Sequence, residues 1–174
     1  MNCLKNWLNL TQHDSVCRSS ALIALATCDS LALLEAIFGN VLVPEAVFSE
    51  LTVVDKPQAA RLRSYLHGKV RAVDMQCFVY LDAFADAGET QAMLLYKEVA
   101  ADYLLIDDKR GRKVAKINQI KTVGSLGVLL QAKRAGLIPC VAPLIEQIAA
   151  GPVFMSERLM QTALELADEA GERG

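Results

Sequence analysis

The chain of 174 residues is 53% hydrophobic and 22% charged, and it carries a formal net charge of −2 at pH 7. This length suits a single domain, and this composition excludes a disordered or low-complexity chain. The small net charge gives no overall indication of nucleic-acid binding. The longest apolar run, residues 21–26, is far shorter than the roughly 18 residues of a membrane span, and no signal peptide is recognisable. We therefore expect a cytoplasmic protein without a membrane partner.

Short β-rich runs alternate with helical patterns along the first half of the chain. Ser19 or Ser20 is placed to cap a helix over 21–25. The pattern then predicts, in chain order, a helix from Asp29 or Ser30 to Gly39, a strand over 40–43, a helix opened by Pro44, a helix over 57–67 and a strand over 69–73.

The same alternation continues through the second half. It predicts a helix over 89–100, a buried strand over 103–106, a basic helix over 109–117, a short strand within 118–123, and helices over 124–135, 140–150 and 156–170. Strands that alternate with helices in this way are typical of an α/β fold with a mostly parallel sheet.

The first seventeen residues do not follow this pattern. Leu4, Trp7 and Leu8 have helical spacing, but residues 13–17 make a poor strand. We therefore expect an N-terminal extension over 1–17, whose structure the pattern does not predict, and a single domain over 18–174.

The five cysteines are scattered at positions 3, 17, 28, 77 and 140, without a C-x-x-C pair. With only His13 and His67 beside them, they offer no plausible zinc ligand set. We expect them to be small buried hydrophobic residues in a reducing compartment.

Four acidic residues break the local pattern and are candidates for chemistry. Glu50 lies beside the apolar stripe of its helix, Glu89 opens a helix, and Asp107 and Asp108 directly follow the apolar strand over 103–106. Singly, each has a structural explanation: Glu50 could reach solvent, Glu89 could complement a helix dipole, and Asp108 could cap the basic helix. Together they predict carboxylates that converge at the carboxyl edge of the sheet, where oxygen ligands suit Mg²⁺ or Mn²⁺.

A basic stretch follows these acids. Residues 109–145 contain no Asp or Glu but hold eight basic side chains, among them Arg112 and Lys116. Such a patch is compatible with a phosphate-bearing partner, and it is equally typical of solvated helix faces.

Three stretches of the chain resemble the PIN-domain family, in particular the branch of predicted nucleic-acid-binding proteins related to VapC toxins. They are SSALIALATCDSLALLEAIFGNVLVPEAVFSEL, GETQAMLLYKEVAADYLLIDDKRGRKVA and GSLGVLLQAKRAGLI. The resemblance covers about residues 18 to 160. It implies a three-layer α/β/α sandwich with a central, mostly parallel sheet of about five strands, so that residues 18–174 form one PIN-like domain. It also implies metal-dependent ribonuclease activity, often as the toxin of a toxin–antitoxin pair.

The family's functional residues carry over by position. The resemblance implies catalytic roles for Glu50, Glu89, Asp107 and Asp108, and metal ligation by the first three. The arginine beyond the strand-end acids matches Arg112, and the late glycine and its hydroxyl neighbour match Gly124 and Ser125. Together with the basic patch, this predicts RNA binding by Arg112, Lys116 and Ser125.

Two positions depart from the family pattern. The family usually has Asp or Asn two residues before the first-motif Ser20, where this chain has Arg18, and Val123 stands where threonine is frequent. A guanidinium cannot ligate a cation. Either the site has lost a ligand, or Arg18 supplies the positive charge of the metal and modifies the site. A shifted alignment would make Asp14 the missing acid.

Three functions follow from these observations. The first is a Mg²⁺- or Mn²⁺-dependent endoribonuclease of toxin type, with RNA as substrate and a small antitoxin protein as partner. The second is a PIN-like protein that binds RNA or a protein partner without cleavage. The third is another α/β enzyme or signalling domain, such as a receiver-like domain, that shares the acid pair by accident. The chain lacks the strand-end lysine and the first-strand acid pair that would support it. An apolar C-terminal stretch could form a homodimer interface or simply core: Leu144, Ile145, Ile148, Phe154 and Leu159.

Overall fold

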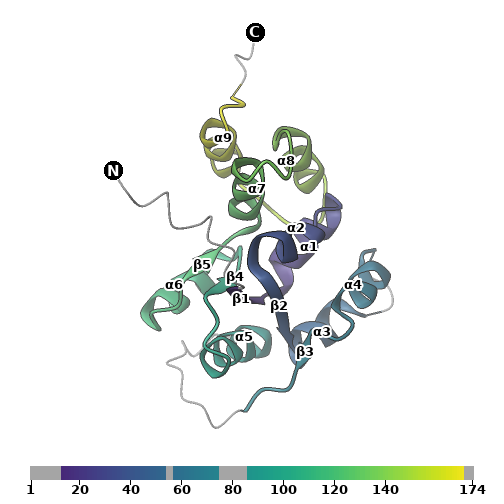
Figure 1. Cartoon of the computed structure of the whole chain (residues 1–174), viewed down its shortest axis with the longest axis vertical. Helices are drawn as coiled ribbons and strands as arrows, with labels where there is room; N and C mark the ends of the chain where they lie inside the picture. Colours follow the sequence, from purple (N-terminus) through teal and green to yellow (C-terminus); the bar gives the residue numbers. More distant parts are fainter. Residues whose placement is uncertain (1–12, 54–56, 75–85, 171–174) are drawn as a thin grey trace.

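The computed structural model describes residues 13–53, 57–74 and 86–170 (Figure 1). These residues form a five-stranded parallel sheet in the order β3-β2-β1-β4-β5. The strands are β1 (His13–Cys17), β2 (Gly39–Pro44), β3 (Val70–Arg71), β4 (Tyr103–Leu105) and β5 (Thr122–Val123). The predicted α/β architecture with a parallel central sheet is confirmed.

The central strand β1 was not foreseen. Residues 13–17, which the sequence analysis placed in an N-terminal extension, pair with β2 on one side and with β4 on the other. Their local β propensity is weak, but Val16 and Cys17 are completely buried, so the strand is specified by packing on both faces of the sheet. The remainder of the predicted extension, with Leu4, Trp7 and Leu8, lies outside the described residues.

Each predicted helix is present, with ends shifted by a few residues. The helices are α1 (Ser19–Thr27), α2 (Ala32–Phe38), α3 (Glu45–Leu51), α4 (Ala59–Leu66), α5 (Ala87–Glu98), α6 (Lys109–Ile117), α7 (Ser125–Arg134), α8 (Ala142–Ala149) and α9 (Glu157–Leu166). The expected serine cap of α1 is wrong: its N-cap is Arg18, and no side chain caps this helix.

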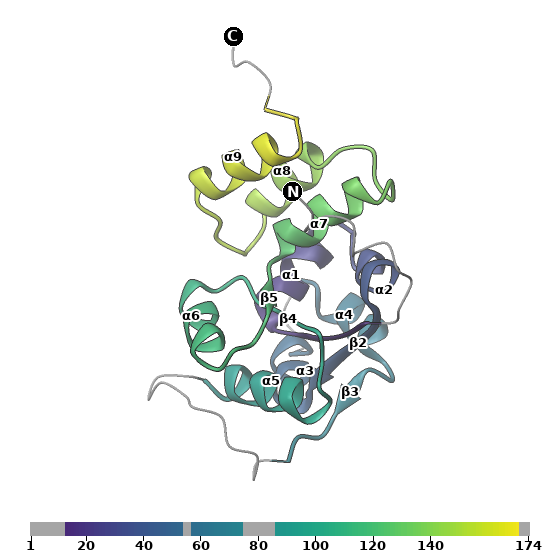
Figure 2. The same cartoon turned by 60° about the vertical axis from the view of Figure 1, so that its left-hand side comes forward.

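Two apolar clusters lie on the two faces of the sheet. Successive side chains of a strand point to opposite faces, so Leu104 joins the smaller cluster with α5 and α6, whereas Leu105 joins the larger one. The larger cluster contains buried residues of α1, α2, α3, α4, α7, α8 and α9. Figure 2 shows α7, α8 and α9 gathered at one end of the molecule, next to α1. The sheet therefore lies between two helical layers.

In the described ranges, no single helix is long and apolar enough to cross a membrane. Helices α1 and α2 together have sufficient length and apolar composition, but they are bent by 117° relative to each other and their apolar side chains belong to the core. Of the cysteines in these ranges, Cys17 and Cys28 are buried, and burial raises the pKa of both thiols. Both behave as the small buried hydrophobes that the sequence analysis expected. Cys140 is only partly buried, which contradicts the expectation there, and Cys3 and Cys77 lie outside the described residues.

Glu169 joins the residues that follow α9 to the rest of the domain. Its Oε1 accepts hydrogen bonds from the Val141 N–H at 2.8 Å and from Lys133 Nζ at 2.6 Å. Its Oε2 accepts from the Ala142 N–H at 2.8 Å. Lys133 also donates to the carbonyl oxygen of Ala167. Burial opposes ionisation of Glu169, but the Lys133 ammonium and the two N–H groups outweigh it and lower the pKa of this carboxyl. One side chain thus joins α7, the start of α8 and the residues after α9.

Glu169→Gln should lower the free energy of unfolding by about 1–2 kcal/mol at pH 7, because it removes charge-assisted hydrogen bonds at the start of a helix. The folded-state pKa of Glu169 lies below its ordinary value of 4.5, so the stabilisation is present above that value and is lost as the pH falls through the lowered pKa. Urea unfolding at several pH values measures both effects. Glu165→Gln, an exposed neighbour on α9, is the matched control and should change stability by less than about 0.5 kcal/mol. Equal effects of the two substitutions would contradict this role of Glu169.

Candidate functional site

The site lies at the carboxyl edge of the sheet, between the central strand and β4. Arg18 directly follows β1, and Asp107 comes two residues after the end of β4. The chain leaves β1 towards β2 on one side, while β4 lies on the other side of β1. In parallel α/β sheets, ligand sites form at such a reversal of strand order. A pocket of about 1030 Å³ opens there, and its lining includes Arg18, Arg112 and the predicted acids Glu50, Glu89, Asp107 and Asp108.

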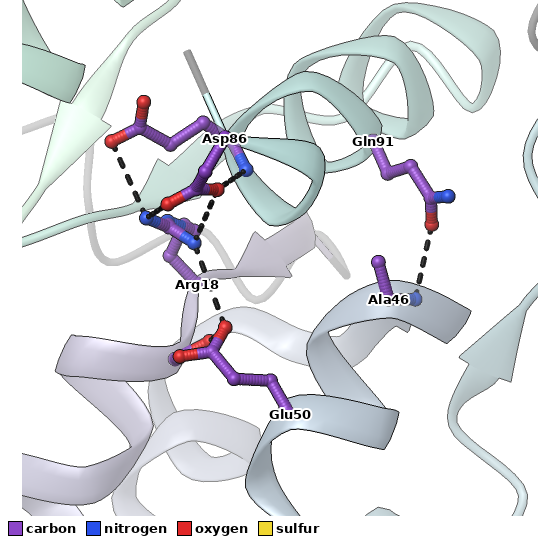
Figure 3. A network of polar contacts seen from close by, with 7 residues as sticks. Arg18, Ala46, Glu50, Asp86 and Gln91 are labelled. Atoms are coloured by element: carbon purple, nitrogen blue, oxygen red, sulfur yellow. Dashed lines mark hydrogen bonds and ion pairs between the residues drawn. The ribbon is translucent and has the colours of Figure 1, made fainter. Parts of the chain in front are cut away.

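The Arg18 guanidinium stands among three carboxylates (Figure 3). Its Nη1 and Nη2 donate to Oδ1 and Oδ2 of Asp86, at 3.1 and 2.8 Å. Nη2 also lies 3.3 Å from Oε1 of Glu89, and Nη1 lies 3.8 Å from Oε2 of Glu50. The contact with Asp86 is bidentate, which is the strongest geometry for an arginine–carboxylate pair.

Three separate elements bring these groups together. Arg18 occupies the N-cap position of α1, Glu50 lies on α3, and Asp86 is the N-cap of α5, where its side chain accepts from the Glu89 N–H. Ser19 Oγ donates to Glu50 Oε2 at 2.6 Å and fixes the third carboxylate. A positive charge at a helix N-terminus opposes the helix dipole, so Arg18 depends on these acids for its position.

The first turn of α5 leaves room for the guanidinium. A Cβ atom at Gly88 would lie 2.7 Å from Arg18 Nη1, closer than side-chain atoms normally approach. A larger residue at this position would therefore displace the Arg18 guanidinium from its contact with α5. On the same helix, Gln91 Oε1 accepts from the N–H of Ala46 at 3.0 Å, so that α5 and α3 are joined beside the acidic group (Figure 3).

The carboxylates around Arg18 have different electrostatic environments. Burial raises the pKa of Glu89, and the nearby Asp86 and Asp108 add to this rise, although Arg18 opposes it. Burial also acts on Asp86, but the Glu89 N–H and the Arg18 guanidinium outweigh it and lower the pKa of Asp86. Asp86 is therefore the principal ionised partner of Arg18, whereas the pKa of Glu89 is shifted in the opposite direction.

The two strand-end aspartates have separate structural partners. Asp108 is the N-cap of α6 and accepts from the Gly111 N–H, as one alternative in the sequence analysis expected. Asp107 Oδ1 accepts from the Ser125 N–H at 2.8 Å and lies 3.8 Å from Arg112 Nη2. Burial raises the pKa of Asp107, although Ser125 and Arg112 oppose the rise. Asp107 Oδ2 is buried and has no hydrogen-bond partner, which is costly for a carboxylate.

The predicted RNA-binding residues lie in different environments. Arg112 lines the pocket, with its Nε donating to the Ile106 carbonyl and 41% of its side chain exposed. Lys116 is exposed near the end of α6 but does not line the pocket. Ser125 is completely buried, so its hydroxyl does not reach a ligand in this conformation.

The structure argues against the shifted alignment. Asp14 lies within β1, and its Oδ1 accepts from Asn40 Nδ2 at 2.8 Å. It lines a different hollow, near the start of β2, and the residue at the carboxyl end of β1 is Arg18. Asp14 therefore does not replace the missing acid.

Asp86 is the site residue that the sequence analysis missed. It stands three residues before Glu89, and this D-x-x-E spacing at the start of a helix is typical of a capping box. The spacing predicts a helix cap. It carries no signal that the cap also binds an arginine 68 residues earlier in the chain.

The residues of this site do not fit a divalent ion in this conformation. The oxygens that would face an ion from Glu50 and Glu89 are instead directed at the Arg18 guanidinium, together with those of Asp86. Across the described ranges, no group of three or more His, Cys, Asp or Glu side chains is arranged to hold a metal. The predicted ligation of Mg²⁺ or Mn²⁺ by Glu50, Glu89 and Asp107 stays a prediction that depends on where Arg18 lies.

Asp86→Asn should lower the free energy of unfolding by about 1–2 kcal/mol at pH 7, because it weakens a bidentate pair with a largely buried arginine. The loss is limited because the Asp86 side chain is 60% exposed and water screens the pair. The stabilisation is present above the ordinary carboxyl value of 3.8 and is lost as the pH falls through the lowered pKa. The measurement is urea unfolding of both proteins from pH 7 downward.

The matched control is Asp29→Asn, which weakens an exposed pair with Arg61 at 3.0 Å. This control should change the free energy of unfolding by less than about 0.5 kcal/mol at any pH. If Asp86→Asn had no larger effect than the control, the Arg18 network would not contribute to stability.

Comparison with known families agrees with this geometry. A family model described as DUF3368, a PIN domain, matches residues 14–169. No curated protein matches the chain significantly. The matched range includes β1 and extends to Glu169, so it covers the sheet, both helical layers and the whole pocket. The branch related to VapC toxins stays a prediction. The match over nearly the whole chain, together with the parallel sheet and its strand-end site, shows that this chain belongs to the PIN-domain family.

Proposed function

We propose that this PIN domain binds RNA in the pocket at the carboxyl edge of its sheet, and that Arg18 takes the place of a divalent ion there. Membership of the family gives the chain a nucleic-acid-binding nuclease fold. The observation that carries the proposal is the position of Arg18, with charged nitrogen atoms 2.8–3.8 Å from three carboxylates. Of the functions predicted from the sequence, this geometry favours RNA binding without efficient cleavage.

The reason is electrostatic. Carboxylates that share a partly buried pocket repel each other unless a cation lies among them. A guanidinium stays charged at all physiological pH values and binds carboxylates through its planar fork. A divalent ion would compete with Arg18 for the same oxygens, and the two cations would repel each other at short range. We therefore expect weak metal binding in the wild-type protein.

RNA would be held mainly through its phosphates. Lys109 and Arg110 are exposed at the start of α6 and line the pocket together with Arg112. Basic side chains at this position provide contacts with the RNA backbone that do not depend on sequence. Lys116 extends the basic surface along α6 beyond the pocket.

A metal-dependent endoribonuclease of toxin type is the second candidate. Two observations favour it: Glu50, Glu89, Asp107 and Asp108 line one pocket, and the buried Asp107 Oδ2 has no partner. In this candidate, Glu50, Glu89 and Asp107 would hold Mg²⁺ or Mn²⁺ only after Arg18 had left the acidic group. An antitoxin and a homodimer belong to the same candidate.

Arg18→Asp should tighten Mn²⁺ binding about tenfold or more, because it removes the competing cation and adds a carboxylate ligand. Isothermal titration calorimetry of the wild type and the variant measures the change, with Arg18→Asn as a milder variant if the Asp variant is unstable. Arg110→Asp is the matched control: it makes the same change of charge at the pocket but outside the acidic group, and it should alter the affinity only about threefold or less.

Equal Mn²⁺ affinity of the wild type and Arg18→Asp would contradict the role of Arg18. RNA cleavage by the wild type that is abolished by EDTA would favour the second candidate over the first.

Arg112→Ala and Lys116→Ala should each weaken RNA binding to a similar extent for unrelated sequences, and each should lower the slope of log K against log salt by about one. Fluorescence anisotropy of labelled single-stranded RNA at several salt concentrations gives these slopes. Arg61→Ala is the control, since Arg61 is a half-exposed arginine of α4 that does not line the pocket. Unchanged slopes for both α6 variants would assign these residues to a solvated helix face.

A further inference from the structure

The segment between α8 and α9 exposes an aromatic ring at the pocket. Phe154 is 91% exposed, more than any other large hydrophobic residue in the described part of the chain. It lines the same pocket as Arg18 and the start of α6. Figure 2 shows this segment descending from α8 on the side of the molecule where α6 lies. An aromatic side chain left in water contributes nothing to the core, and an exposed apolar patch at a pocket is a candidate binding site.

The ring stands on an apolar wall. Pro152, Val153, Met155 and Leu159 line the pocket beside Phe154, and Leu159 is itself 49% exposed. Met155 is buried in the larger cluster and anchors the segment to the domain. Ser156 caps α9 through a hydrogen bond from the Leu159 N–H, which fixes the end of the segment. Phe154 is therefore exposed directly before two residues that fix the segment to the domain.

Most of the remaining pocket lining is charged, and it divides into two parts. The acidic part holds Arg18 with its partners Glu50, Asp86 and Glu89 and the strand-end Asp107 and Asp108, and the basic part lies at the start of α6. Lys109, Arg110 and Arg112 come from α6, and all three side chains have exposed surface. A pocket that combines an exposed aromatic ring with cations suits a ligand that has both a flat π-face and a negative charge. An unpaired nucleotide has both features: its base stacks on aromatic rings, and its phosphate binds Lys and Arg.

We infer that Phe154 is a stacking residue for an unpaired RNA base whose phosphate is held by the basic start of α6. This inference rests on the proposed RNA binding and narrows its ligand to single-stranded RNA. A base within a duplex has both of its faces covered by its neighbours, so duplex RNA gains nothing from Phe154.

The small exposed apolar area at the pocket and the positive charge beside it favour single-stranded RNA over a second copy of the chain as the ligand. Among the large exposed hydrophobic residues that the structure describes, only Phe154 and Leu159 line the pocket. The apolar area of two side chains is far smaller than the roughly 800 Å² of surface that each partner buries in a stable protein–protein complex. A symmetric dimer contact uses the same patch on both copies, so it would also bring the basic side chains at the start of α6 of the two copies close together, where they would repel each other.

The test compares single-stranded and duplex RNA of the same length by fluorescence anisotropy. Phe154→Ala should weaken binding of the single strand by roughly 5- to 150-fold, the range for loss of one stacked base, and should leave duplex binding unchanged. Leu137→Ala is the matched control, because Leu137 is 46% exposed but does not line the pocket. This control should bind both RNAs as the wild type does.

A second variant tests for stacking directly. Phe154→Trp should retain the affinity for single-stranded RNA, and its added tryptophan emission should be quenched as RNA is titrated. The wild type, whose single tryptophan is Trp7, gives the background signal.

The outcomes separate the two proposals. If single-stranded RNA binds with strong salt dependence, but Phe154→Ala has no effect and Phe154→Trp is not quenched, the stacking role is wrong while RNA binding stands. If the wild type binds neither RNA, the proposed function itself fails, and the stacking role fails with it. If Phe154→Ala turns a dimer into a monomer in light scattering and leaves RNA affinity unchanged, Phe154 belongs to a protein interface and the inference is overturned.

Discussion

The ion pairs of Arg18 are the interaction on which the rest of the site depends. They join the end of the central strand to α3 through Glu50 and to α5 through Asp86 and Glu89. Without the guanidinium, three carboxylates would face each other across a narrow space, and their repulsion would push α3 and α5 apart. The hydrogen bonds of Ser19 and Gln91 and the absence of a side chain at Gly88 all fit around this one cation.

The same interaction changes what the family's acidic residues can do. Their oxygens already have a cation, so under the proposed function we expect them to attract a divalent ion less than an uncompensated cluster would. A fixed guanidinium has no open coordination position for water, and it cannot be exchanged. Under the proposed function, the acids keep their position while their chemistry is altered, and a ligand would contact mainly the basic and aromatic parts of the pocket.

The pocket is assembled from distant parts of the chain. Arg18 follows β1, and the acids of the pocket come from α3, from the start of α5 and from the residues after β4. The basic part comes from α6, and the apolar wall comes from the segment before α9. Glu169 and Lys133 fasten the C-terminal helices to α7, and Met155 joins the intervening segment to the core. Stability at the far end of the chain thus keeps Phe154 at the pocket.

The sequence by itself determined the helices, the other four strands and the edge of the sheet where the site lies, because helical periodicity, strand-end acids and Asp108 as a cap are local features. It also indicated that Arg18 stands where the family has an acid. It did not reveal β1, since residues 13–17 are specified by burial between two neighbouring strands rather than by propensity. Only the tertiary structure decided that Asp86 is the main partner of Arg18, that Ser125 is buried and that Phe154 lies at the pocket. These three facts depend on contacts between residues far apart in the chain, and no local pattern encodes such contacts.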